Sequence, residues 1–165
     1  MLQEVAGDDM ATAPGDSPLE QFADLYRRQL RPMVRLAYLL TGGSPAAEEL
    51  VQESFLAVHR RWDSIQQPSA YLRQVVVHRA ASHRRRAALE ARKAPAPPPS
   101  SVEQPVDELR DAIAALPPRQ RAAIVLRYYE DLPEADIAAA MACGVPAVKS
   151  LLHRGLRELR KVVEP

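Results

Sequence analysis

Apolar residues recur at three- and four-residue steps along most of this chain, a spacing that predicts amphipathic helices. The first such segment covers residues 19–41, where Pro32 predicts a kink or a division because proline removes an internal hydrogen bond. Ser44 and Pro45 then predict the start of a second helix, with Ser44 as its N-cap. The predicted buried face of that helix consists of Val51, Phe55, Val58 and Trp62.

A third helix is predicted from Pro68 to residue 93, with an apolar side that can pack on the two preceding helices. Residues 94–105 read APAPPPSSVEQP, a composition that favours an extended linker and excludes helix or sheet. Helical spacing resumes at residue 106, is interrupted at Pro117-Pro118 and continues over residues 119–130. The pattern predicts an all-α fold in which two small helical domains, 19–93 and 106–165, are joined by the proline-rich linker.

Residues 132–162 have the pattern of a helix-turn-helix. A short apolar stripe ends near Met141, Gly144 provides a residue that tolerates unusual backbone angles, and Pro146 suits the start of a helix. One side of the second helix is apolar, and the other is basic and hydrogen-bonding: Lys149, Ser150, His153, Arg154, Arg157 and Lys161. That side would suit phosphates and base edges in a major groove. An ordinary helical hairpin with a solvated basic face would show the same short pattern.

The net charge of +1 conceals a strong segregation of charge. The first 21 residues hold five acids and no Lys or Arg, and residues 1–18 have the composition of a disordered acidic tail. Residues 64–93 hold seven Lys or Arg against one Glu, a net of +6. Such segregation indicates a segment that contacts nucleic acid between acidic flanks.

The basic segment lies on the third predicted helix and carries Arg73, His78, Arg79, His83, Arg84, Arg85 and Arg86. Tyr71 and Trp62 are near enough in sequence to offer stacking planes. Cations beside aromatic rings suit a single-stranded nucleic acid, by phosphate neutralisation and base stacking. The run at residues 84–86 is equally typical of a solvated helix end.

The sequence gives little indication of a disulfide framework, a metal site or a cofactor site. Cys143 is the single cysteine, so no disulfide framework or cysteine-based metal cluster is predicted, and His78 and His83 lack partner ligands. We therefore expect no metal and no cofactor. No apolar run approaches a membrane span, and the first residues lack the order of a signal peptide. These features predict a cytoplasmic protein without membrane contact.

The order of these segments resembles the sigma-70 family of transcription initiation factors, in the two-domain extracytoplasmic-function (ECF) group. Residues 47–55, AEELVQESF, are similar to an acidic signature of the family, with Glu49, Leu50, Gln52, Glu53 and Phe55 matching by position. Residues 71–86 resemble the stretch that melts and reads the minus-ten element. Ile137-Ala138, Val148-Lys149-Ser150, His153-Arg154 and Leu159-Arg160 resemble the part that reads the minus-thirty-five element.

The resemblance implies partners and site residues. The matched residues of 47–55 would bind the β′ clamp helices of core RNA polymerase, and the β flap is a further expected contact. Promoter DNA would be bound at the minus-ten element by Tyr71, Arg73, His78, Arg79, Arg84, Arg85 and Arg86. It would be bound at the minus-thirty-five element by Lys149, Ser150, His153, Arg154 and Arg157. Many members are held inactive by an anti-sigma protein, which is therefore a candidate partner.

Several positions depart from the family pattern. Tyr71 and His78 stand where Trp and Asn are usual, and an Asp common near Ser82 is missing. Ala142 replaces the usual turn glycine, and Pro146-Ala147 replaces Gly-Thr, which removes one hydroxyl that could contact a phosphate. These departures put the base preference at both promoter elements in doubt.

Promoter recognition without covalent chemistry is thus the expected function, with catalysis left to the polymerase. The main alternative is a helix-turn-helix regulator that binds duplex DNA independently of polymerase, although no heptads or ligand domain indicate a dimer. A nuclease or hydrolase is less consistent, because Glu48, Glu49 and Glu53 share one helix with no His or second acidic cluster placed to complete a site.

Overall fold

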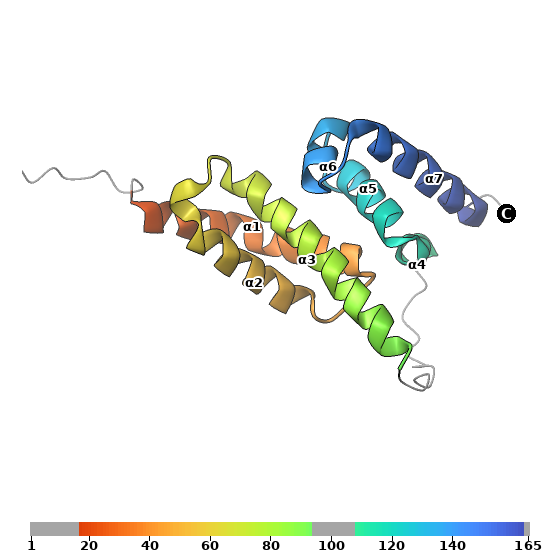
Figure 1. Ribbon diagram of the computed structural model, residues 1–165, viewed down its shortest axis with the longest axis horizontal. Coiled ribbons are helices and arrows are strands. Elements are labelled where there is room, and N and C mark those ends of the chain that lie inside the picture. Colours follow the sequence, from red (N-terminus) through yellow and green to blue (C-terminus); the bar gives the residue numbers. More distant parts are fainter. Residues whose placement is uncertain (1–16, 94–107, 164–165) are drawn as a thin grey trace, which may run out of the picture.

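The computed structural model describes residues 17–93 and 108–163, and in these two ranges every regular element is a helix (Figure 1). The predicted all-α fold is confirmed. Most of the expected acidic tail, the whole predicted linker at 94–105 and residues 106–107 lie outside the described residues.

Helix α1 spans Pro18–Thr41 as one element. Its start is fixed by a capping box, in which the Ser17 hydroxyl accepts from the Glu20 backbone N–H and the Glu20 carboxylate reaches back to Ser17. The sequence predicted a kink or a division at Pro32; the helix is not divided there, because α1 continues through this residue. The helix ends at Gly42, whose φ of 75° lies in the left-handed region.

Helices α2 (Ala47–Arg60) and α3 (Pro68–Ala91) complete the first unit and are joined through a short 3-10 turn at Trp62–Ser64. The predicted N-cap at Ser44 is wrong, since α2 begins at Ala47. The Ser44 hydroxyl instead accepts from the Ala46 backbone N–H at 3.2 Å, within the turn that precedes the helix. The three helices pack on one another, and the side of α2 that carries Val51 and Val58 is fully buried.

The second unit contains α4 (Glu108–Ala115), α5 (Pro118–Tyr128), α6 (Glu134–Ala140) and α7 (Val145–Val163). Helices α6 and α7 form the predicted helix-turn-helix. The left-handed residue of its turn is Ala142, with a φ of 50°, and not Gly144 as the sequence suggested. At Gly155, an added Cβ would lie 2.8 Å from Cγ1 of Ile124, so glycine allows α7 to approach α5 closely.

No single helix in the described ranges is long and apolar enough to cross a membrane. The helices over Glu134–Ala140 and Val145–Val162 reach that length and composition only as a pair, and they are bent by 100° at the turn between them.

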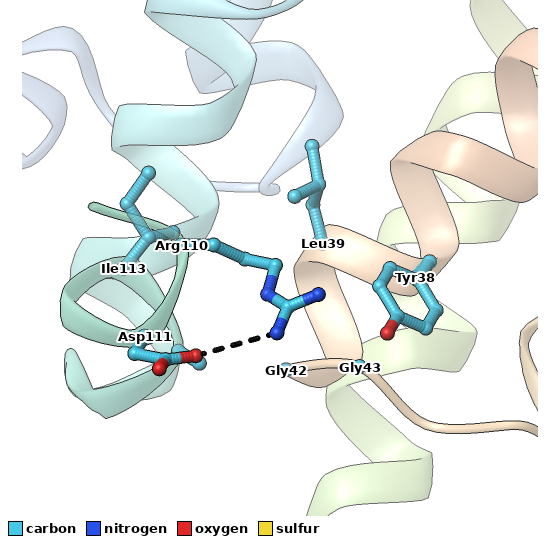
Figure 2. Close-up of a pocket in the computed structure, with 8 residues that line it drawn as sticks. Tyr38, Leu39, Gly42, Gly43, Arg110, Asp111 and Ile113 are labelled. Atoms are coloured by element: carbon cyan, nitrogen blue, oxygen red, sulfur yellow. Dashed lines mark ion pairs between the residues drawn. The ribbon is translucent and has the colours of Figure 1, made fainter. Parts of the chain in front are cut away.

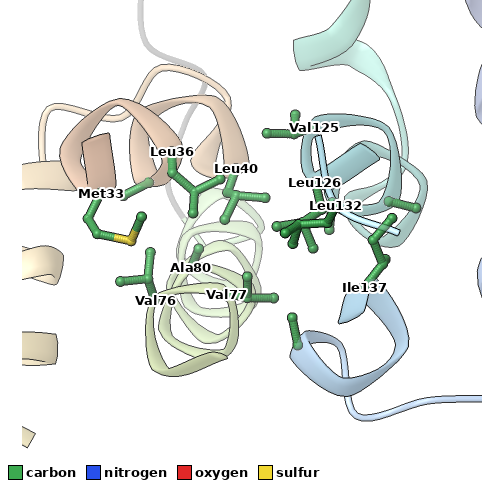
Figure 3. Close-up of a cluster of buried hydrophobic side chains, with 14 of the residues drawn as sticks. Met33, Leu36, Leu40, Val76, Val77, Ala80, Val125, Leu126, Leu132 and Ile137 are labelled. Carbon is green, nitrogen blue, oxygen red and sulfur yellow. The ribbon is translucent and has the colours of Figure 1, made fainter. Parts of the chain in front are cut away.

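The two units pack against each other (Figure 1). Their buried apolar side chains form one core. Leu40 of α1 and Val77 of α3 point toward Leu126 of α5 and Leu132 (Figure 3). Helix α6 contributes Ile137 to the same cluster and packs on α3. This junction was not expected from the sequence, which predicted two domains on a tether.

A buried guanidinium spans the junction. Arg121 of α5 is fully buried, and its Nη1 donates to the carbonyl oxygen of Leu40 at the end of α1 (3.2 Å). The same side chain donates to carbonyl oxygens within its own unit, those of Ile113 (3.0 Å), Leu116 (2.9 Å) and Ala114. Burial, with a smaller effect of neighbouring Arg84, lowers the pKa of Arg121 to about 10, so the group remains charged at neutral pH.

Candidate functional site

Helix α2 presents a mixed polar and apolar surface to solvent. Glu49, Gln52 and Glu53 are exposed, as expected for residues that contact a partner. Leu50 and Phe55 are only 6% and 2% exposed, so these two predicted contact residues belong to the core and cannot form part of that surface. Their burial follows from the position of α2, which packs against both α1 and α3 and therefore buries a wide stripe.

Leu56 is an exposed apolar residue on this surface, with 55% of its area accessible. It lies four residues after Gln52 and three after Glu53, so the helical spacing places all three on one face. Leu56 was not among the predicted contact residues, because the family signature ends at Phe55. We define the α2 surface as Glu49, Gln52, Glu53 and Leu56.

Two interactions hold the polar residues of the α2 surface. The Gln52 side-chain amide donates to the Tyr26 hydroxyl of α1 at 3.0 Å. The Glu53 carboxylate accepts from Nη1 of Arg79 on α3 at 2.7 Å in an ion pair that is largely exposed. Arg79 had been predicted as a DNA contact, and in this structure it lies beside the α2 surface.

The predicted basic face of α3 is divided among different directions. Arg73 forms an ion pair with Glu130, which follows α5, at 3.2 Å, and Arg84 donates to the carbonyl oxygen of Thr41 at 2.9 Å. His78, Arg85 and Arg86 are exposed. Arg73 and Arg84 therefore face the junction between the units, whereas the exposed cations of α3 lie elsewhere on the helix.

A cavity of about 570 Å³ lies at the start of α3, between the two units. Its walls include Arg61, Tyr71, Arg73 and Gln74 from the first unit and Asp136, Ala139 and Ala140 from α6. Arg61 donates to the Tyr71 hydroxyl at 3.2 Å, a hydrogen bond that raises the pKa of Arg61. Arg61 was not predicted as a site residue. Its position next to Trp62, an aromatic residue expected to offer a stacking plane, could have indicated it.

Another, smaller cavity of about 240 Å³ lies where α4 meets the end of α1 (Figure 2). Tyr38, Leu39 and Gly42 line one side, and Arg110 and Ile113 line the other. No predicted site residue reaches it.

Helix α7 presents the predicted basic face in full. Val148, Leu151 and Leu152 are buried, and the opposite side is exposed, including Lys149, Ser150, His153, Arg154 and Arg157. Arg154 donates through Nη2 to the Ser150 hydroxyl at 3.0 Å, so one exposed side chain of this face orients another. Lys149 lies 3.8 Å from Glu134 of α6 in an exposed pair. Arg157 likewise lies 3.7 Å from Glu158, and all five of these side chains remain exposed to solvent.

In residues 17–93 and 108–163, no group of three or more His, Cys, Asp or Glu side chains is arranged to hold a metal ion.

Two family descriptions match this chain, Sigma-70 region 2 over residues 25–90 and Sigma-70 region 4 over residues 107–159. The chain belongs to the sigma-70 family. The two matched regions correspond to the three-helix unit and to the helix-turn-helix unit, and together they cover most of this sigma factor.

Relatives place the chain in the ECF group. It is 32% identical to the ECF RNA polymerase sigma factor SigE of Mycolicibacterium smegmatis, over 95% of this chain and 67% of the relative. It is 30% identical to the RNA polymerase sigma-E factor of Streptomyces avermitilis, over 87% and 86%. It is also 30% identical to the ECF RNA polymerase sigma factor SigL of Mycobacterium tuberculosis, over 85% and 87%. This chain is accordingly an ECF RNA polymerase sigma factor, as the sequence predicted.

Solved structures share its fold. The sigma factor RpoE of Bartonella quintana, in complex with the anti-sigma factor NepR, superposes with a TM-score of 0.73 at 20% identity, over 88% of this chain and 98% of that one. CnrH, in complex with the cytosolic domain of CnrY, gives a TM-score of 0.64 at 20% identity, over 88% and 89%.

Proposed function

We propose that this ECF sigma factor acts through three separate surfaces, one for core RNA polymerase and two for promoter DNA. The observation that carries the proposal is the exposed face of α7, which sits on a helix-turn-helix and belongs to a matched family region. The α2 surface and α3 lie in the other matched region. Each predicted role therefore has a distinct element to perform it.

The α2 surface is the proposed docking site on polymerase. It combines two carboxylates with an exposed leucine, and an apolar residue ringed by charges is typical of a protein interface. Helix α2 lies on the side of the first unit away from α5, α6 and α7 (Figure 1). A partner as large as the β′ clamp helices can therefore reach it without displacing the second unit.

The second helix of the helix-turn-helix, α7, is the proposed reader of the upstream element. Lys149, Arg154 and Arg157 supply positive charge for phosphates or guanine edges, and Ser150 and His153 can donate to or accept from bases. Pro146 and Ala147 are exposed at the start of α7 and have no side-chain hydroxyl. At this end of α7, only backbone groups could then contact a DNA phosphate.

The start of α3 is the proposed site for the melted strand. Tyr71 and Arg73 line the larger cavity, whose aromatic and cationic groups suit an extruded base and its phosphate. Exposed His78, Arg85 and Arg86 continue along the helix toward its end. Capture of an unstacked base can offset the few kcal/mol that unstacking costs.

The sigma factor performs no covalent chemistry, since polymerase carries out RNA synthesis, and it works in the cytoplasm, where the polymerase is. The β flap is a second polymerase contact. An anti-sigma protein is a candidate regulator, because the similar RpoE was solved in complex with one.

Transcription in vitro with core polymerase and randomised promoter DNA tests this function. The wild-type chain should select a promoter family and initiate from it. The double variant Glu49→Lys, Leu56→Ala should keep its helical circular dichroism and lose most co-purification with polymerase, whereas Glu90→Lys, an exposed change at the end of α3, should retain it. Stable operator binding by the chain alone, with no response to polymerase, would contradict the proposal.

A further inference from the structure

The smaller cavity, between the end of α1 and α4, is lined by none of the residues assigned to polymerase or to DNA (Figure 2). Its volume is about 240 Å³, somewhat below the usual range of about 300–1,000 Å³ for pockets that hold drug-sized ligands. The cavity therefore has room for a small molecule, and the groups on its two walls determine which chemical class it can hold.

Two hydrogen-bond donors face the cavity from opposite walls. The guanidinium of Arg110 on α4 extends toward Gly42, and the Tyr38 side chain of α1 stands across from it (Figure 2). Among the hydrogen bonds of the described residues, none involves the Tyr38 hydroxyl. The turn beneath them is Gly42-Gly43, where a Cβ added to Gly43 would lie 3.3 Å from that hydroxyl oxygen. The two donors thus converge on a space that the glycines leave open.

Two further cations lie directly behind this turn. A Cβ added to Gly42 would lie 2.7 Å from Nη1 of Arg84 and 3.0 Å from Nη1 of Arg121. Burial, and after it the like charge of Arg84, lowers the pKa of Arg121, so positive charges already repel one another here. With Arg110, three guanidinium groups lie around Gly42, and Asp111 is the one carboxylate among the residues that line the cavity. This excess of positive charge favours an anion.

The Asp111 carboxylate is a weak competitor for Arg110. Its oxygen lies 3.6 Å from Nη2 of Arg110, beyond hydrogen-bond length, and the two side chains are 61% and 38% exposed. An exposed ion pair of this length contributes little to stability, so an incoming anion can displace it.

The walls also indicate what kind of anion fits. Phosphate suits Arg110 well, because two of its oxygens can accept parallel hydrogen bonds from one guanidinium. Leu39, Ile113 and Ala114 add an apolar wall beside these donors. Such a wall suits a carbon-containing group attached to the phosphate.

We propose that the cavity between α1 and α4 binds a small organic phosphate, held by the Arg110 guanidinium and the Tyr38 hydroxyl over the Gly42-Gly43 turn. The phosphate lies on the turn, where the two arginines behind it add positive potential, and the carbon-containing group packs on the apolar wall. The site is separate from the α2 surface, α3 and α7, so this binding goes beyond the proposed promoter recognition.

Calorimetric titration of the full chain with phenyl phosphate, at constant ionic strength, tests the site, because this probe joins a phosphate to a flat apolar ring. The wild type should bind phenyl phosphate, bind inorganic phosphate more weakly, and give no measurable binding of uncharged benzyl alcohol. Arg110→Gln should weaken the binding of phenyl phosphate by about tenfold and Tyr38→Phe by about fivefold, as expected for one charged and one neutral hydrogen bond.

Asp111→Asn should have the opposite effect, which damage to the fold cannot imitate. It removes the competing carboxylate and should tighten the binding of phenyl phosphate by about threefold, in keeping with the small energy of an exposed ion pair. Arg60→Gln and Asp63→Asn make the same charge changes at exposed positions at the end of α2 and in the turn that follows it. These two control variants should bind phenyl phosphate as the wild type does.

A wild-type chain that binds neither phosphate probe would overturn the proposal. Equal weakening by Arg110→Gln and Arg60→Gln would mean that the anion responds to net charge and does not occupy this cavity. An Asp111→Asn chain with no gain in affinity would contradict the role of Arg110. Equal affinities for phenyl phosphate and inorganic phosphate would contradict the role of the apolar wall.

Discussion

Ala142 adopts a left-handed backbone conformation, with a φ of 50°, in the turn between α6 and α7. A side chain at Cβ makes this conformation unfavourable by roughly 1–2 kcal/mol, and only glycine visits it freely. Alanine replaces a family glycine at this position, yet the sequence pattern assigned the unusual angles to Gly144. That prediction was wrong because glycine marks such positions in most turns but does not have to occupy them.

Ala142→Gly should therefore stabilise the protein by roughly 1 kcal/mol, since the relief of strain exceeds the entropy that glycine adds to the unfolded chain. Urea unfolding followed by circular dichroism measures the change. Ala139→Gly is the matched control, because it lies at an exposed position inside α6 and should destabilise by about 1 kcal/mol. Equal effects of the two changes would argue against a strained turn.

Arg121 is the largest fully buried side chain in the described part of the chain, and it donates to backbone carbonyls of α1, of α4 and of the short segment that follows α4. Arg121→Ala should destabilise the protein by roughly 3 kcal/mol, because it removes charged hydrogen bonds and leaves buried acceptors unpaired. Thermal unfolding measures the loss. Arg119→Ala, two residues earlier and exposed, should have an effect below about 0.5 kcal/mol.

Helix α7 is the element that the sequence predicted best. Its apolar stripe repeats within a single helix, so local spacing alone determines which side is buried and which is exposed. Helix α2 was predicted less well, because a family match fixes residue identity and says nothing of exposure. Leu50 and Phe55 match the signature and are nevertheless core residues.

Arg154 offers a direct test of the exposed face of α7. Arg154→Ala should weaken binding of holoenzyme to the upstream element by about tenfold, equivalent to a loss in the range of 1–3 kcal/mol for a base-edge contact. Footprinting and competition assays measure the change. Arg119→Ala, an exposed change near the start of α5, should change affinity much less; an identical loss would mean that the effect of Arg154→Ala is not specific to the exposed face of α7.

The arginines at the end of α3 should have different roles, two in DNA binding and one in stability. Arg85 and Arg86 are exposed, and replacing both with alanine should lower the salt dependence of open-complex formation by about 0.7 in the logarithmic slope for each phosphate that is no longer neutralised. Arg84→Ala should instead lower thermal stability, because Arg84 donates to Thr41 at the end of α1. A stable Arg84→Ala chain with an unchanged junction would contradict this division.

The packing of the two units against each other was the feature that the sequence predicted least well. Arg73 and Glu130 are separated by 57 positions, and nothing in local spacing or composition pairs them. A proline-rich linker indicates freedom between domains, and it gives no information on whether their faces are complementary. Such long-range contacts depend on the complementary surfaces of two folded units. Local spacing along the chain carries no information about these surfaces.

A shared core predicts cooperative behaviour of the whole molecule. The wild-type chain should unfold in one calorimetric transition, because separation of the units exposes Leu40, Val77 and Leu126 together. Glu130→Arg should split this into two transitions, each near the stability of one unit. Two resolved transitions in the wild type would mean that the units melt independently.

The ion pair between Glu53 and Arg79 connects the two faces of the first unit. Any cationic group of a docking protein that engages Glu53 has to compete with a guanidinium 2.7 Å away. If such a group displaces Arg79 from Glu53, the Arg79 guanidinium becomes available on α3, the helix proposed to hold the melted strand. Binding of a protein at the α2 surface would thereby add an unpaired cation to α3. The affinity of α3 for DNA would then be highest in a chain that is already bound to polymerase.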